Sequence, residues 1–106
     1  MNKQQLIAAF TAAKVAMLAN ADIEDKGTSN MDRAAIFPGR KRKAIEAAAA
    51  EAGVELFDSR WLGQLCLFVR LPGNSGQGYR RTAMAEACTK VLKDAGLEAS
   101  TYYQID

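Results

Sequence analysis

The hydrophobic pattern of this chain changes its period after Gly53, and that change limits the folds open to it. Residues 54–62 and 65–71 are rich in aliphatic and aromatic side chains. Between them, Gly63-Gln64 suits a two-residue type II′ turn with glycine first. The two segments therefore predict a β-hairpin. Amphipathic patterns of helical spacing lie on both sides of it, which excludes an all-helical and an all-β fold.

The helical patterns cover residues 3–19, 40–52 and 79–95. Asn2, with Gln5 three residues later, predicts a capping box at the start of the first helix. Gly53 and Gly96 follow the other two helices, where glycine commonly ends a helix.

Two further segments suit strands. Residues 97–106 alternate between apolar and polar side chains, which predicts a half-exposed strand. Residues 33–37 precede Pro38-Gly39, and they fit either a short strand or an extended entry into the next helix.

The predicted order is helix, short strand, helix, strand, strand, helix, strand. This is the split β-α-β arrangement of ferredoxin-like folds, with one additional N-terminal helix. We therefore predict a single α+β domain over residues 1–106, because 106 residues suffice for one core. Its mostly antiparallel sheet has four strands, or three if residues 33–37 do not pair, and helices pack against it.

The residue inventory excludes several chemistries. The chain has no histidine, so Ser-His-Asp and Cys-His nucleophile pairs and His-ligated zinc cannot be built from it. Cys66 and Cys88 lie in apolar patterns without Cys-x-x-Cys spacing, which favours two reduced, buried thiols. No apolar run reaches the length of a membrane span. We expect a cytoplasmic, non-enzymatic protein with no cofactor, no metal and no membrane partner.

Charge is distributed unevenly along the chain, which a net charge of +2 conceals. Most basic residues fall in two windows without acids: Arg33, Arg40, Lys41, Arg42 and Lys43, then Arg60, Arg70, Arg80 and Arg81. Two basic groups occupy the first turn of a predicted helix, where the helix dipole opposes cations by a few tenths of a kcal/mol each. A bound anion would reverse that penalty.

These observations predict an anion or nucleic-acid site built from Arg40, Lys41, Arg42, Lys43, Arg80 and Arg81 with the backbone of Gly76 and Gly78. If the first and third strands are parallel central neighbours, the helices that follow them start at the same end of the sheet. The two basic helix starts then converge. Asp22, Glu24, Asp25 and Asp32 form a separate acidic region.

The hairpin supplies a second candidate surface. Phe57, Trp61 and Phe68 share one face with Cys66, and a tyrosine of the last strand joins them. RNA-recognition modules stack bases on such aromatic side chains, with basic residues nearby for the phosphates. The candidate surface therefore consists of Phe57, Arg60, Trp61, Phe68 and Arg70. The simpler interpretation, which we favour, is that the N-terminal helix covers this face with its apolar stripe.

The glycine-rich loop carries two resemblances. Residues 72–96, with Gly76-Gln77-Gly78-Tyr79 at the start of a helix, resemble the pyrophosphate loop of the N-acetyltransferase superfamily, which implies acyl-CoA binding. The pattern Gly76-x-Gly78-x-Arg80-Arg81-x-Ala83 also resembles the last helix of double-stranded-RNA-binding domains, in which adjacent basic residues hold phosphates. Met84 replaces a further basic residue of that family.

The leading prediction is a small binding module for a negatively charged partner, most simply nucleic acid, which acts through basic helix starts and the glycine-rich loop. One alternative is a protein-interaction module, such as an inhibitor or adaptor encoded by a phage or mobile element, that binds an acidic or nucleic-acid-handling protein. Another is a degenerate acyl-CoA-binding protein. The alanine-rich surface of residues 40–52 also suits a homodimer contact.

Overall fold

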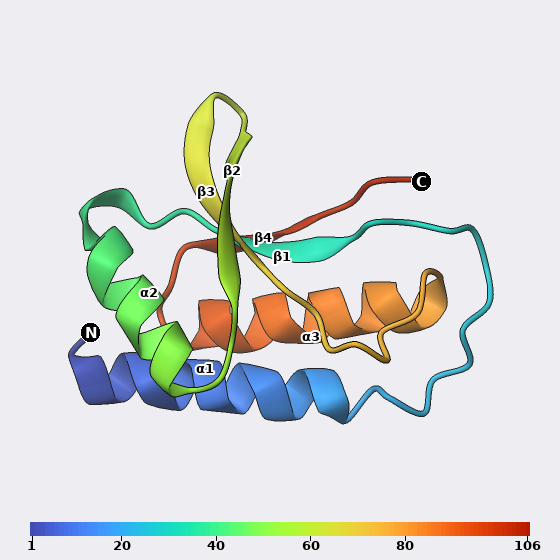
Figure 1. The fold of residues 1–106 in the computed structure, drawn as a ribbon, viewed down its shortest axis with the longest axis horizontal. Coiled ribbons are helices and arrows are strands. Elements are labelled where there is room, and N and C mark those ends of the chain that lie inside the picture. Colours follow the sequence, from blue (N-terminus) through green and yellow to red (C-terminus); the bar gives the residue numbers. More distant parts are fainter.

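The computed structural model describes residues 1–106 and contains three α-helices and a four-stranded antiparallel sheet (Figure 1). The prediction of a small α+β domain is confirmed. No helix combines the length and the apolarity needed to cross a membrane. In chain order the elements are α1 (Lys3–Leu18), β1 (Arg33–Ile36), the 3₁₀ turn η1 (Gly39–Lys41), α2 (Arg42–Glu51), β2 (Leu56–Trp61), β3 (Gln64–Val69), α3 (Tyr79–Asp94) and β4 (Ala99–Tyr102).

The helices begin and end close to the predicted positions. The capping box at α1 is present, because the Asn2 side chain accepts from the Gln5 N–H and the Gln5 side chain accepts from the Asn2 N–H, both at 2.8 Å. The predicted helix 40–52 begins with η1, so its basic residues are divided between a 3₁₀ turn and the first turn of α2. Gly53 ends α2 with φ of +76°.

The sheet has the strand order β2-β3-β1-β4, so residues 33–36 form a central strand. In β1, Ala35 lies opposite Phe68 of β3 and opposite Ser100 of β4. Ala34, Ala35 and Ile36 are fully buried. The ambiguity of this segment in the sequence follows from its length of four residues and its alanine content, since alanine has little preference for strands.

The hairpin is present, but the predicted turn is wrong by one residue. Trp61 pairs with Gln64, so the two turn residues are Leu62 and Gly63. Both have positive φ, +56° and +74°, as a type I′ turn requires. The pairing register therefore differs by two residues from the one implied by a Gly63-Gln64 turn. Because side chains alternate with a period of two, Phe57, Trp61, Cys66 and Phe68 still share one face, as predicted.

The two faces of the sheet differ in what covers them. The main core lies between the sheet and the helices: α3 packs against β1 and β4, and α1 packs against α2 and α3. The other face carries a smaller cluster that contains no helical residue: Ala35, Phe37, Phe57, Trp61, Cys66, Phe68 and Tyr102. We call this cluster, together with Arg33 and Arg70 beside it, the aromatic face.

The expectation that the N-terminal helix covers the aromatic face is wrong. The apolar stripe of α1, which includes Leu6, Phe10 and Met17, is buried in the main core. Helix α2 meets it there with Ala48 and Ala49, whose small side chains permit a close approach between helices. Part of the alanine surface considered for a dimer contact is therefore used inside the domain, and the aromatic face has no covering layer.

The basic starts of α2 and α3 do not converge, which corrects a second expectation. Strand β1 is antiparallel to β3, so the C-terminal ends of these two strands lie at opposite ends of the sheet. Each strand leads to its helix, and Figure 1 accordingly shows α2 on the left and the start of α3 on the right. The cause is the hairpin, which reverses the chain between β2 and β3 after the crossover through α2.

Candidate functional site

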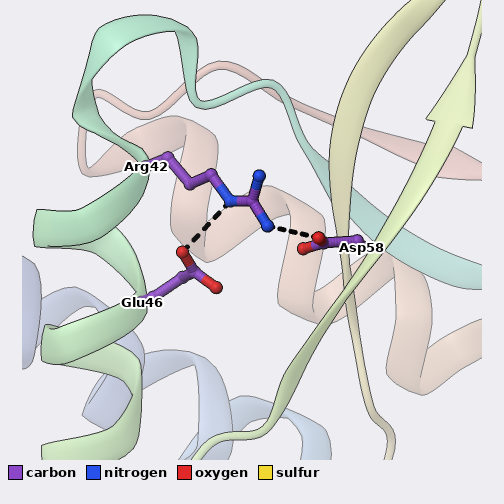
Figure 2. Close-up of polar contacts among 3 residues, drawn as sticks. All are labelled: Arg42, Glu46 and Asp58. Atoms are coloured by element: carbon purple, nitrogen blue, oxygen red, sulfur yellow. Dashed lines mark hydrogen bonds and ion pairs between the residues drawn. The ribbon is translucent and has the colours of Figure 1, made fainter.

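The basic residues at the start of α2 include one that the domain uses internally. Arg42 bridges two carboxylates (Figure 2): its Nε donates to Glu46 one turn later at 3.2 Å, and its Nη2 donates to Asp58 on β2. The hydrogen bond to Asp58 raises the pKa of Arg42 further above its usual value. Arg42 therefore ties α2 to the hairpin. Arg40, Lys41 and Lys43 are exposed and form no ion pair.

The start of α3 already holds an anion from the chain itself. The Asp25 carboxylate accepts hydrogen bonds from the backbone N–H groups of Gly78 at 2.8 Å and Gln77 at 3.1 Å. These two bonds, Gln77 first, lower the pKa of Asp25. A Cβ atom on Gly76 would lie 2.2 Å from Asp25 Oδ2, and one on Gly78 would lie 2.3 Å from the Lys26 carbonyl oxygen. Because these two glycines have no side chains, the loop that carries Asp22, Glu24 and Asp25, called the acidic loop below, can approach the start of α3.

This arrangement removes the donors that the glycine-rich loop was predicted to offer. An acyl-CoA pyrophosphate, or any other external phosphate, would have to displace Asp25 from Gln77 and Gly78. Arg80 is also engaged, because its Nε donates to the Ile23 carbonyl at 2.9 Å and its Nη1 to the Asn74 carbonyl at 3.0 Å. The motif that resembled a phosphate loop thus joins the acidic loop to α3.

The aromatic face brings side chains of all four strands together. Trp61 from one edge strand stacks on Tyr102 from the other, with ring centroids 5.2 Å apart and planes inclined by 22°. Phe37 lies 5.6 Å from Trp61. The two rings meet because the middle of this face carries Ala35 and Cys66, which are fully buried and too small to hold them apart.

Phe68 and Phe57 extend the aromatic cluster toward the other end of the hairpin. The Phe68 ring lies 5.2 Å from Tyr102 and 5.7 Å from Phe57, the latter edge to face. Phe68 is buried, whereas Phe57, Trp61 and Tyr102 are partly exposed. The partly exposed aromatic residues of the cluster therefore come from both edge strands.

Two arginines lie over these rings. The guanidinium carbon of Arg33 is 5.0 Å from the Phe68 centroid and 5.4 Å from that of Phe57, and Arg70 is 5.7 Å from Phe57. These are cation–π distances. Arg70 also pairs with Glu55 at 2.6 Å. Within the strands this face carries no acidic residue, because Asp58, the only acid in any strand, alternates to the opposite face.

The structure unites four of the five residues proposed for the interaction surface: Phe57, Trp61, Phe68 and Arg70. Arg60 lies on the opposite face, paired across the hairpin with Leu65, and donates to the Gly63 carbonyl at 3.3 Å. Arg33 and Phe37 also lie on this face, although neither was predicted there. Each lies two residues from Ala35, and residues two apart in a strand lie on the same face. This spacing becomes informative only once residues 33–36 are known to form a strand.

Both cysteines are free and buried, as predicted. Cys66 lies beneath the aromatic rings, and Cys88 lies in the main core. Burial raises the pKa of each thiol, in Cys88 to about 12. Because a thiol with so high a pKa is hardly ever a thiolate, Cys88 is a packing residue rather than a nucleophile.

Comparisons with protein-family models, with curated proteins and with solved structures gave no significant match. The aromatic face and its arginines are therefore the features of this chain that bear on its function.

Proposed function

We propose that this chain is a non-enzymatic module that binds single-stranded nucleic acid on the aromatic face. One observation carries the proposal: no helix covers the partly exposed aromatic residues that both edge strands contribute to this face. Arg33 and Arg70 lie beside these residues. Stacking a base on an aromatic side chain requires an unpaired base, since the faces of paired bases are hidden in the duplex. The arginines would meet the phosphates between stacked bases.

The arrangement of strands also supports a finer description of the fold. We infer a ferredoxin-like split β-α-β domain with an additional N-terminal helix, since the order β2-β3-β1-β4 with α2 and α3 as crossovers suits it. Four-stranded sheets of RNA-recognition modules likewise stack bases on aromatic side chains. We also infer a reducing, cytoplasmic setting, which the two unpaired thiols favour.

Fluorescence anisotropy tests the proposal with labelled RNA and DNA, each single-stranded and double-stranded, at two salt concentrations. We expect preference for single strands. Arg81 lines the same hollow as Arg33, Phe57 and Arg70. Three phosphate contacts, from these three arginines, imply a slope of log K against log salt of about −2. Trp61 is the only tryptophan of the chain. Quenching of its emission on binding provides an independent readout, because the stacked base would lie on or beside its ring.

A matched pair of variants tests which face binds. Arg70 and Arg60 are both exposed arginines of the hairpin, but only Arg70 lies on the aromatic face. Arg70→Gln should weaken binding and flatten the salt slope by about 0.7, whereas Arg60→Gln should change neither. Loss of one stacking ring in Tyr102→Ala should cost about 1–3 kcal/mol, or about 5- to 150-fold in affinity.

Two results would refute the proposal. Equal binding of single and double strands without any change in Trp61 emission would point instead to the exposed cations at the start of α2. Failure to bind any nucleic acid at low salt would favour the protein-interaction alternative, in which the same rings bury apolar surface and binding depends little on salt.

A further inference from the structure

A hollow of about 260 Å³ lies at one end of the aromatic face, where β3 runs into the loop before α3. It borders Phe57, so it continues the surface on which bases are proposed to stack. Its volume is several times the roughly 30 Å³ that one water molecule occupies in the liquid. Its polar wall contains Arg33, Arg70, Gly73, Ser75 and Arg81. Three arginines from separate parts of the chain thus line one hollow, and no acidic residue lines it.

Two of these guanidinium groups are free to bind a ligand. Arg33 and Arg81 form no ion pair, and each donates only through Nε, to the carbonyl groups of Met31 at 3.0 Å and Asp32 at 2.9 Å. The Nη groups therefore have no acceptor within the chain. The charge of Arg70, in contrast, is partly offset by Glu55.

The two free arginines are close enough to repel each other. Burial lowers the pKa of Arg81 and the charge of Arg33 lowers it further, with a partial offset from Asp32. The Asp32 carboxylate is turned away, since it accepts from the Thr82 hydroxyl at 2.7 Å and from the Gln104 N–H at 2.8 Å. An anion in the hollow would offset this repulsion and accept hydrogen bonds from the unpaired Nη groups.

The charge of the hollow suits a phosphate monoester better than a diester. A monoester carries about −1.5 to −2 at neutral pH, which matches two unpaired guanidinium groups, whereas an internal phosphate of a nucleic acid carries −1. Pro72, Gly73 and Ser75 form part of the wall where the sheet ends. A phosphate in the hollow would therefore lie beyond the end of the sheet, next to Phe57.

We propose that this hollow binds the terminal phosphate monoester of a single strand whose bases stack on the aromatic face. The inference rests on the proposed function for the strand, while the hollow itself requires only a phosphate monoester next to Phe57. The same chemistry occurs at a 5′ and at a 3′ end, and the experiment distinguishes the two.

The test compares one single-stranded oligonucleotide in three forms: with a 5′-phosphate, with a 3′-phosphate and without a terminal phosphate. We expect one phosphorylated form to bind about tenfold or more tightly than the unphosphorylated form, since two charge-assisted contacts are added. Anisotropy at a fixed salt concentration measures the difference.

Gly73 offers a variant that leaves the fold intact. A Cβ atom there meets no atom within 4 Å, and its φ lies outside the left-handed region. Gly73→Asp places a carboxylate at the hollow and should abolish the preference for the phosphorylated form, whereas Gly73→Asn, with the same shape and no charge, should retain it. Arg81→Gln should reduce the preference as Gly73→Asp does.

The outcomes separate this proposal from the proposed function. If the oligonucleotide binds equally with and without either phosphate, the hollow is not a phosphate site, although binding to the aromatic face stands. If no oligonucleotide binds, uridine 5′- and 3′-monophosphate are compared with uridine in thermal unfolding. A rise in melting temperature with one monophosphate, lost in Gly73→Asp, then supports the hollow alone. Without that rise both proposals fail.

Discussion

Replacing Leu62 by asparagine should stabilise the protein, although leucine is the more hydrophobic residue. Leu62 is the first residue of the type I′ turn and has φ of +56°, a conformation that costs an L-residue about 1–2 kcal/mol. Asparagine tolerates it, and Asn-Gly is a favoured type I′ pair. The loss is small because 77% of Leu62 is exposed; at about 2 kcal/mol for full burial, the buried remainder is worth about 0.5 kcal/mol. The expected net gain is about 0.5–1.5 kcal/mol.

Thermal and urea unfolding followed by circular dichroism measure this gain. For a domain of this size, 1 kcal/mol corresponds to about 4–8 °C in melting temperature, so Leu62→Asn should unfold a few degrees higher. The slope of the unfolding free energy against urea concentration should not change, because unfolding exposes the same amount of surface. Leu62→Ala is the control, since it removes the same apolar surface but keeps the unfavourable positive φ.

A Leu62→Asn variant no more stable than Leu62→Ala would contradict this prediction. That result would mean that the turn relaxes at little cost, or that Leu62 makes contacts worth more than its exposure implies. Binding of nucleic acid should be unaffected in either variant, because Leu62 lies at the tip of the hairpin and belongs to neither sheet cluster.

Three further predictions test the loops and the core. Because the pKa of Asp25 is lowered, its contribution to stability is present above its unfolded value of about 3.8 and is lost as pH falls through the lower folded value; below about pH 4 the melting temperature of wild type should therefore fall more steeply than that of Asp25→Asn. Asp32→Ala should destabilise by about 2–3 kcal/mol in urea unfolding, because the Thr82 hydroxyl and the Gln104 N–H lose their acceptor, and Asp32→Asn should cost less. Cys88 should react with iodoacetamide at pH 8 only when urea unfolds the chain, as mass spectrometry would show; fast labelling of the native protein would contradict its burial.

The sequence predicted those parts of the fold that depend on local pattern. The helices, the hairpin and the common face of Phe57, Trp61 and Phe68 follow from periods of 3.6 and 2, which neighbouring residues alone determine. The turn was misplaced because Gly63 fits either position of a two-residue turn, and leucine gives no signal for a positive φ.

The missed features depend on contacts between distant residues. The capping anion of α3 comes from Asp25, 53 residues before Gly78, so a glycine-rich start with nearby arginines could not be distinguished from an empty anion site. The sequence also did not determine which face of the sheet is covered by helices. The apolar stripe of α1 could be buried against α2 and α3, as it is, or against the aromatic face.

The position of the candidate site follows from how much of each arginine the fold already uses. A guanidinium has five N–H donors in a fixed plane. Arg42 and Arg80 each use two groups on partners that hold elements together, so they set geometry and have little capacity left for a ligand. Arg33 and Arg81 each use one group on a backbone carbonyl and have no carboxylate partner. Because Arg33 lies over the partly exposed Phe57 and Arg81 lines the hollow that Phe57 borders, charge and apolar surface coincide there. This combination suits a stacked base and its phosphate.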